Sequence, residues 1–253
     1  MTLRLKQLMR NWVMAFITPR PLVGVFYLPR YFANWIRFRG LGGGMPAAPA
    51  DSYPCLTDWS AETPFDYHYF YQGAWLARRI GKARPARHVD VGSSVLTISV
   101  LSAFVETLFI DFRPLRARLA GLESVADDIT GLSLADDSVE SLSCLHVIEH
   151  IGLGRYGDPL DPDGGRKAAA ELKRVLKPGG SLYLSAPVGR QRVCFNAHRV
   201  FTPGTLQSFF AGLETVSFSL VNDQGTFQEN AALEEAEHLE YGCGMFEFRK
   251  PVA

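Results

Sequence analysis

The first fifty residues contain no acidic side chain, and the whole chain has no formal net charge. Overall neutrality provides no long-range field that would attract nucleic acid, so we predict no nucleic-acid partner. Residues 1–50, which we call the N-terminal arm, carry a charge of +7 that the rest of the chain balances with −7. The basic residues of this arm are Arg4, Lys6, Arg10, Arg20, Arg30, Arg37 and Arg39.

The arm also lacks an apolar run of the roughly 20 residues that a membrane-spanning helix requires. Arg20 interrupts the apolar run, and Pro19, Pro21 and Pro29 divide it further. No small-residue cleavage site of a signal peptide follows Arg10. We therefore expect a cytoplasmic protein. The basic and aromatic residues of the arm suit peripheral contact with an anionic membrane surface, and a solvated, partly docked extension is the alternative.

Cysteine is scarce and scattered. Cys55, Cys144, Cys194 and Cys243 show neither metal-ligand nor redox spacing, so the sequence predicts no metal site. Without an export signal, we expect all four thiols to be reduced.

Two parts of the chain differ in composition. The Gly/Pro/Ala stretch 41–50, at the end of the arm, predicts a linker. It leads into one domain over 51–253, with a sheet core from about residue 84. Strand and helix patterns then alternate, which predicts a parallel sheet covered by helices on both faces. The expected strands are 88–91, 107–110, 124–128, 139–145, 181–185, 214–220 and 241–249, and the expected helices are 72–80, 95–104, 165–176 and 205–210.

The first motif is His88-Val89-Asp90-Val91-Gly92-Ser93-Ser94, a strand followed by a turn of small residues and a helix. A glycine there allows close approach of the backbone to a ligand. Asp111 follows Asp90 by 21 residues, at the end of the next strand, where nucleotide-binding folds place an acidic residue on a ribose hydroxyl. The pair predicts a nucleotide-type cofactor at the carboxyl ends of these strands.

Three further blocks carry a family resemblance. They are residues 126–138, the helix and Lys-Pro-Gly-Gly turn of 171–180, and the closing stretch 241–250. Together with the first motif, they resemble the successive blocks of class I S-adenosylmethionine-dependent methyltransferases. The resemblance implies a doubly wound, mostly parallel, seven-stranded Rossmann-like sheet after the N-terminal extension.

A closer resemblance is to domain-of-unknown-function family 268. It is carried by Asp111-Phe112-Arg113-Pro114, by the run from Glu149 to Asp158, and by Phe195-Asn196-Ala197-His198-Arg199. Bacterial relatives are associated with surface-polysaccharide synthesis, so the resemblance implies a small or glycan-type acceptor.

The methyltransferase resemblance also implies the residues that hold S-adenosylmethionine. Asp90, Gly92 and Ser93 would lie at the methionine end, and Asp111 would hold the ribose. Asp128 and Ile129 would border the adenine, and His146 would face the cofactor or the acceptor. Methyltransferases usually have further glycines where Ser93 and Ser94 stand.

The candidate catalytic residues are His146, Glu149, His150 and His198. A hydroxyl acceptor must lose its proton, which suits a histidine with a near-neutral pKa, and we expect His198 or His146 to be the base. The candidate acceptor-binding residues are Arg155, Tyr156, Asn196 and Arg199, since arginine pairs with phosphate or carboxylate. The alternative for 196–199 is a loop held together for structural reasons.

Three other patterns have competing interpretations. His146-Val147-Ile148-Glu149-His150 also matches the H-x-x-E-H zinc-peptidase signature, which requires a helix. Asp158, Asp161 and Asp163 suit a divalent cation together with His150, or a solvated turn. The aromatic block Phe65–Tyr71 suits a lid, a stacking surface or plain packing.

We therefore predict an S-adenosylmethionine-dependent methyltransferase that methylates oxygen on a small or glycan-type acceptor. The alternative is a binding or scaffold protein that kept the fold and lost turnover, which the Ser93-Ser94 loop favours.

Overall fold

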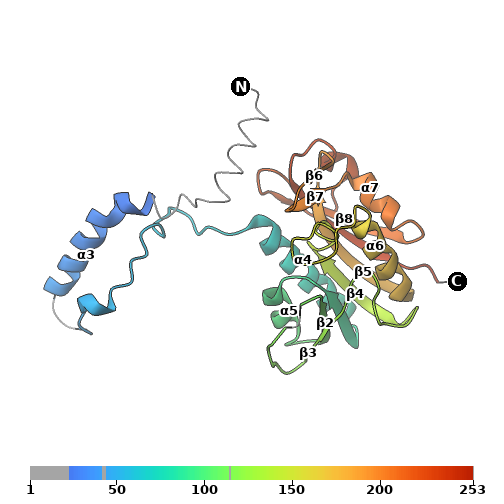
Figure 1. The fold of residues 1–253 in the computed structure, drawn as a ribbon, viewed down its shortest axis with the longest axis horizontal. Coiled ribbons are helices and arrows are strands. Elements are labelled where there is room, and N and C mark those ends of the chain that lie inside the picture. Colours follow the sequence, from blue (N-terminus) through green and yellow to red (C-terminus); the bar gives the residue numbers. More distant parts are fainter. Residues whose placement is uncertain (1–22, 42–43, 114, 253) are drawn as a thin grey trace. The chain divides into compact units, whose positions relative to one another are not determined.

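The computed structural model describes residues 23–41, 44–113 and 115–252 (Figure 1). The chain divides into two compact units, Met1–Phe65 and Asp66–Ala253. The sequence analysis placed the boundary after residue 50, whereas the structure places it after Phe65. Residues beyond 50 belong to the first unit because they contact its helix: the Arg30 guanidinium lies 4.0 Å above the Trp59 ring and 3.4 Å from the carbonyl oxygen of Leu56.

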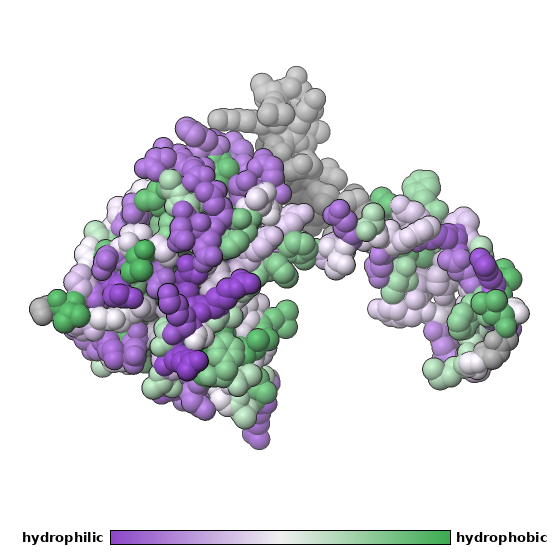
Figure 2. Space-filling view, turned by 180° about the vertical axis from the view of Figure 1, so that it is seen from behind, coloured by the Kyte–Doolittle hydropathy of each residue, from purple (hydrophilic) through white to green (hydrophobic). Residues whose placement is uncertain are grey.

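The first unit contains η1 (Val25–Tyr27), α3 (Leu28–Gly40) and η2 (Pro49–Asp51). Proline in the first turn of α3 and arginines in its last turn suit the two ends of a helix. None of the residues of α3 is buried, and Figure 2 shows hydrophobic and hydrophilic residues side by side on this unit. No helix among the described residues is long and apolar enough to cross a membrane. The arm residues Arg4, Lys6, Arg10 and Arg20 lie outside the described residues.

The second unit is built on an eight-stranded sheet in the order β3-β2-β1-β4-β5-β10-β8-β9. The first five strands in this order are parallel, and β10 is antiparallel to both of its neighbours. This is the predicted doubly wound, mostly parallel sheet with one short extra edge strand, β9. The strands are β1 (Arg87–Val91), β2 (Glu106–Asp111), β3 (Leu122–Ala126), β4 (Val139–Leu145), β5 (Leu176–Val188), β8 (Glu214–Val221), β9 (Phe227–Gln228) and β10 (Gly242–Arg249).

Helices cover both faces of this sheet, as Figure 1 shows. On one face α4 (Tyr67–Ala83) and α5 (Val95–Leu101) bury Trp75, Leu76 and Ile98. On the other face α6 (Gly164–Val175) and α7 (Pro203–Phe209) bury Leu172 and Leu206. The short helix η3 (Leu233–Ala236) and the hairpin of β6 (Arg192–Cys194) and β7 (His198–Val200) complete the unit. Each face buries its own apolar cluster, which is what makes the sheet rigid enough to position a site.

Two of the differences from the sequence-based prediction have a clear structural cause and lie in α4 and β5. Helix α4 begins at Tyr67 rather than at residue 72, because the Asp66 carboxylate accepts a hydrogen bond from the Tyr69 amide at 3.1 Å and caps the helix. The Lys-Pro-Gly-Gly turn lies inside β5 as an irregularity of the ladder: Val139 pairs with Leu176, but Ser141 pairs with Ser181.

Candidate functional site

The loop after β1 forms the floor of a cavity. Gly92 has φ +71, a conformation that side chains other than glycine rarely adopt, and a Cβ there would lie 3.0 Å from the Val147 side chain. The Gly92 amide donates to the carbonyl of Ile110 at 2.8 Å, which fixes the loop against β2. The glycine therefore brings the backbone of the loop close to the space above the strands.

This cavity has a volume of about 600 Å³ and lies at the carboxyl ends of β1, β2 and β4. Its volume is in the range of small-molecule and cofactor pockets. Six residues that the sequence predicts for the cofactor line it: Gly92, Ser93, Asp111, Asp128, Ile129 and His146. The ends of parallel strands are where open α/β sheets bind ligands, so its position agrees with the prediction of a nucleotide-type cofactor.

Asp111 ends β2 at the edge of this cavity. Its carboxylate accepts hydrogen bonds from the Arg113 amide at 2.7 Å and from Arg113 Nε at 3.3 Å, and its side chain is 17% exposed. A carboxylate oriented in this way retains free lone pairs, which suits two vicinal hydroxyl groups. Next along the wall, Asp128 is held by the amide and hydroxyl of Thr130, and Ile129 is almost fully buried.

Asp90 does not lie on the cavity wall. It is fully buried, and its carboxylate accepts hydrogen bonds from the Ser93 amide at 3.0 Å, the Ser93 hydroxyl at 2.6 Å and the Ser143 hydroxyl. Burial raises the pKa of Asp90 to about 6, against the lowering effect of the two serines. Asp90 thus fixes the conformation of the loop through hydrogen bonds inside the protein and does not face the cavity.

A connected set of buried side chains continues from Asp90, and we call it the serine network: His88, Asp90, Ser93, Ser141 and Ser143. Both ring nitrogens of His88 lie 2.8 Å from a serine hydroxyl, Ser141 on one side and Ser143 on the other. Burial lowers the pKa of His88 to about 3. The Ser93 hydroxyl also accepts from the Leu145 amide at 2.9 Å. Ser93 therefore ties β1 to β4, and its hydroxyl is directed into the protein rather than toward a ligand.

Glu149 is the centre of a second group of buried polar residues. One oxygen of its carboxylate, Oε1, lies 2.7 Å from His146 Nδ1 and 3.7 Å from His150 Nε2. The other, Oε2, is buried and has no hydrogen-bond partner among the described residues. His146 follows the last residue of β4 with φ +55, a sparsely populated conformation that is often found at functional sites.

His146 is also surrounded by residues from distant parts of the chain. Its ring stacks on Tyr69 and His68 of α4, and its Nε2 lies 3.4 Å from the Cys243 sulfur of β10. Burial lowers the pKa of His146, but the charges and hydrogen bonds of Cys243 and Glu149 outweigh burial and raise it to about 10. We call the whole group the histidine cluster: His68, Tyr69, His146, Glu149, His150, Tyr241 and Cys243.

Two other histidines of the cluster, His68 and His150, have lowered pKa values, in contrast to His146. Burial, with the charge of His146, lowers the pKa of His68 to about 4, and burial also lowers the pKa of His150. His150 Nδ1 lies 2.6 Å from the carbonyl oxygen of Ala197, so Nδ1 carries the proton and Nε2 is left as an acceptor. His150 is therefore a neutral imidazole on the cavity wall at pH 7.

Of the remaining predicted residues, some line the cavity and others lie away from it. Tyr156 lines the cavity, with the guanidinium groups of Arg113 and Arg155 over its ring at 4.4 and 5.1 Å. His198 lies off the cavity wall and packs against the Tyr241 ring, 4.9 Å away. Asn196 is exposed and likewise does not line the cavity.

Arg199 has a structural position rather than a place on the cavity wall. Its guanidinium is largely buried and donates to backbone carbonyls of Ile151, Asp161 and Pro162 at 2.7 to 3.3 Å. These bonds hold the loop 149–162 together, as the structural alternative for 196–199 expected. Arg155 donates to the carbonyl of Ala197 at 3.0 Å and supports the same loop.

The structure also decides two of the alternative patterns. Residues 146–150 form a turn and not a helix, so His146 and His150 do not make the zinc-peptidase arrangement. The acidic residues of 158–163 are already engaged: Asp158 accepts from the amides of Gly152, Gly154 and Tyr156, and Asp161 pairs with Lys167 at 2.6 Å. These aspartates therefore shape and stabilise the turn.

The sequence analysis did not place α4 or β10 in the site. His68, Tyr69 and Cys243 all contact His146, although Cys243 is 97 residues away from it in the sequence. The only signal in the sequence for any of these contacts was the aromatic block Phe65–Tyr71, which contains His68 and Tyr69. No local spacing connects these residues, because the contacts arise from the packing of α4 on the sheet and from the pairing of β10 with β5.

A comparison with protein families matches residues 114–242, about half of the 253 residues, to the family described as Caenorhabditis protein of unknown function, DUF268. The chain belongs to this family. No curated protein matches this DUF268 sequence.

Solved structures show the fold. The N-methyltransferase NodS from Bradyrhizobium japonicum WM9, in complex with S-adenosyl-l-homocysteine, superposes with a TM-score of 0.52 at 18% identity, over 72% of this chain and 87% of NodS. The 1,6-didemethyltoxoflavin-N1-methyltransferase of Burkholderia thailandensis gives 0.52 at 14% identity, over 93% of this chain and 92% of that enzyme. The [4+2]-cyclase SpnF gives 0.53 at 15% identity, over 72% and 82%. The chain therefore has the fold of class I methyltransferases.

Proposed function

We propose that this protein is an S-adenosylmethionine-dependent methyltransferase that methylates a hydroxyl oxygen of a small or glycan-type acceptor. The observation that carries this proposal is the cavity at the carboxyl ends of β1, β2 and β4. It joins Gly92, Asp111 and Ile129, which suit a nucleoside cofactor, to Tyr69, His146 and His150 of the histidine cluster. One wall is suited to holding a cofactor and the other to handling a proton.

The cofactor half of the cavity fits the group on three points. Gly92 brings the backbone of the loop to the cavity wall, Asp111 presents a carboxylate for the ribose hydroxyls, and Ile129 supplies an apolar wall for the adenine. When bound, S-adenosylmethionine supplies a methyl group on a positively charged sulfur. The protein then contributes mainly by positioning the acceptor in line with that methyl group.

The histidine cluster supplies the base. Burial lowers the pKa of His150, so the ring is neutral at pH 7. Its Nδ1 proton is held by the Ala197 carbonyl, so Nε2, which lies 3.7 Å from Glu149 Oε1, is the nitrogen that would accept the proton of an acceptor hydroxyl. His146 suits this role less well, because its raised pKa keeps it protonated at pH 7. His198, the first choice from the sequence, lies off the cavity wall. We therefore assign the base to His150 and the orientation of the cluster to Glu149.

Calorimetric titration with S-adenosylhomocysteine tests this function without knowledge of the acceptor. We expect saturable binding to the native protein and an affinity 10- to 100-fold lower in Asp111→Asn, because hydrogen bonds to a charged group contribute about 1.5–3 kcal/mol. Glu106→Gln is a matched control, since Glu106 lies at the opposite end of the same strand. Its affinity should equal that of the native protein.

The same titration distinguishes the alternative function. If the native protein is folded and gives no heat with S-adenosylmethionine or S-adenosylhomocysteine, it is a binding or scaffold protein that has kept the fold. Equal loss of affinity in Asp111→Asn and Glu106→Gln would also contradict the proposed cofactor site.

A further inference from the structure

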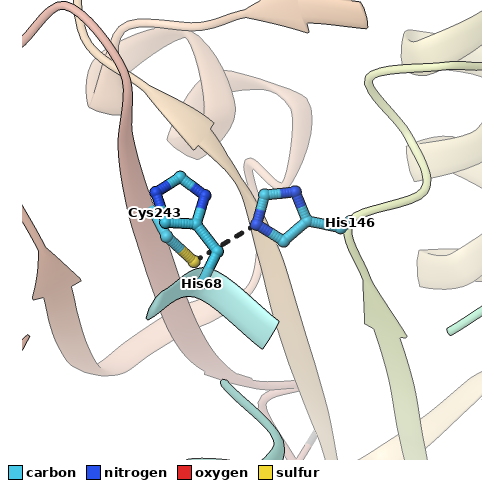
Figure 3. A group of neighbouring side chains, drawn as sticks. All are labelled: His68, His146 and Cys243. Carbon is cyan, nitrogen blue, oxygen red and sulfur yellow. Dashed lines mark hydrogen bonds between the residues drawn. The ribbon is translucent and has the colours of Figure 1, made fainter. Parts of the chain in front are cut away.

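Three potential metal ligands meet inside the histidine cluster. The ring nitrogens of His68 and His146 and the sulfur of Cys243 all lie within 4.8 Å of one another. Figure 3 shows the three side chains converging from α4, from the turn after β4 and from β10. His146 and Cys243 are buried, and His68 is partly buried. Three separate elements of the fold thus deliver two imidazoles and a thiol to one point.

We propose that His68, His146 and Cys243 bind a zinc-type transition metal ion. Imidazole and thiolate are the ligands that zinc prefers, and two histidines with one cysteine leave a fourth tetrahedral position open. Zinc–nitrogen bonds of about 2.05 Å and zinc–sulfur bonds of about 2.3 Å place the N and S ligand atoms of a tetrahedral site about 3.6 Å apart. His146 Nε2 and Cys243 Sγ are already 3.4 Å apart.

The surroundings of the two histidines support the assignment. A metal-binding histidine usually holds its second ring nitrogen in a hydrogen bond to a carboxylate or a backbone carbonyl. His146 Nδ1 donates to Glu149 Oε1 at 2.7 Å, which leaves Nε2 directed at Cys243. The His68 ring stacks on the Tyr241 ring, with the two ring centroids 5.2 Å apart. Both imidazoles are therefore fixed in orientation by a partner outside the site.

Glu149 places a buried carboxylate beside one of the proposed ligands, with Oε1 2.7 Å from His146 Nδ1. Its carboxylate is fully buried, and its Oε2 atom has no hydrogen-bond partner among the described residues. A divalent metal ion on the His146 ring places positive charge next to this carboxylate, which offsets the cost of burying it.

The proposed site borders the cavity through one of its three ligands, His146. His146 and Tyr69, which stack on one another, both line the cavity. Catalytic zinc sites keep a position for water or substrate, whereas structural sites are closed by four protein ligands. The metal would therefore take an oxygen or sulfur ligand from the cavity, and the site exists whether or not the ligand is later methylated.

Cobalt substitution tests the site on the full-length chain. The protein is treated with a chelator and titrated with Co²⁺, and then Zn²⁺ is added as a competitor. We expect one equivalent of Co²⁺, the visible bands of tetrahedral cobalt and a thiolate-to-cobalt charge-transfer band. Cys243→Ser should lose the charge-transfer band, and His68→Ala should lose stoichiometric binding. Glu149→Gln should retain the bands with a 10- to 100-fold lower affinity, the usual effect of removing a partner of a ligand.

Two matched variants control for other thiols and histidines. Cys194 is only partly buried and His238 is exposed, and both belong to the second unit. Cys194→Ser and His238→Ala should bind Co²⁺ like the native protein. Folded native protein that takes up no Co²⁺ would overturn the proposal, as would a charge-transfer band that survives in folded Cys243→Ser. Neither result depends on S-adenosylmethionine, so the metal site and the proposed function fail separately.

Discussion

The serine network and the histidine cluster flank the end of β4 and differ in how completely their polar groups are hydrogen-bonded and in their backbone conformation. In the serine network every polar group has a partner: Asp90 accepts three hydrogen bonds, and both nitrogens of His88 meet a hydroxyl. In the histidine cluster one buried oxygen of Glu149 has no hydrogen-bond partner among the residues that the structure describes, and His146 adopts a positive φ. Each group contains a buried histidine and a buried carboxylate, so the presence of these two residue types does not separate them.

This difference distinguishes a structural role from a functional one. A fully satisfied network makes the fold rigid and leaves nothing for a ligand, whereas an incomplete one is unfavourable unless something completes it. Asp90, assigned to the cofactor by resemblance, belongs to the first kind. Glu149 belongs to the second. The predictions below test this division, from the largest expected effect to the smallest.

Ser143→Ala should cause the largest loss of stability. The Ser143 hydroxyl links His88 to Asp90. Its removal leaves one buried nitrogen of His88 without a partner, at roughly 1–3 kcal/mol, and takes one of the three hydrogen bonds from the Asp90 carboxylate, at roughly 1.5–3 kcal/mol. Ser219→Ala is the matched control: Ser219 is equally buried, but its hydroxyl has no partner among the described residues. Urea unfolding of the control should show no loss. Equal losses in both variants would contradict the role of the serine network.

The pH dependence of stability should show that Asp90 is buried with a raised pKa. Its pKa is raised in the folded protein from 3.8 to about 6, so its stabilising contribution is present below pH 3.8 and is lost as the pH rises through 6. Relative to Asp90→Asn, the native protein should therefore gain up to about 3 kcal/mol between pH 7 and pH 4. His88 is present in both proteins, so its own titration cancels. A difference that does not change with pH would show that Asp90 is not held in this environment.

Zinc should stabilise the histidine cluster and leave the serine network unaffected. At a free zinc concentration 100-fold above the dissociation constant, the native protein should gain about 2.7 kcal/mol, seen as a higher melting temperature. Ser219→Ala should gain the same amount, whereas Cys243→Ser should gain nothing. Stabilisation of Cys243→Ser to the native extent would mean that zinc binds elsewhere.

The sequence predicted the parts of the site that follow strands directly. Gly92 and Asp111 each stand at the end of a strand, so alternating patterns place them at one edge of the sheet. His146 was located for the same reason, at the end of β4. Local order was sufficient because parallel strands bring their carboxyl ends together.

The other half of the site depends on long-range packing. Cys243 reaches His146 because β10 enters the sheet beside β5, and His68 does so because Asp66 caps α4 five residues earlier than the apolar pattern indicates. Neither event leaves a short motif. Whether a side chain is exposed also depends on residues far away in the sequence. Arg199 was predicted to bind the acceptor, but its guanidinium is surrounded by four backbone carbonyls from 149–162.

A crystal structure of the protein with S-adenosylhomocysteine tests the central claim most directly. The account predicts that the ribose hydroxyls lie within hydrogen-bonding distance of the Asp111 carboxylate and that the sulfur faces Tyr69 and His146 across the cavity. A nucleoside bound away from the ends of β1 and β2, or a cavity that stays empty at saturating ligand while the protein remains folded, would contradict it.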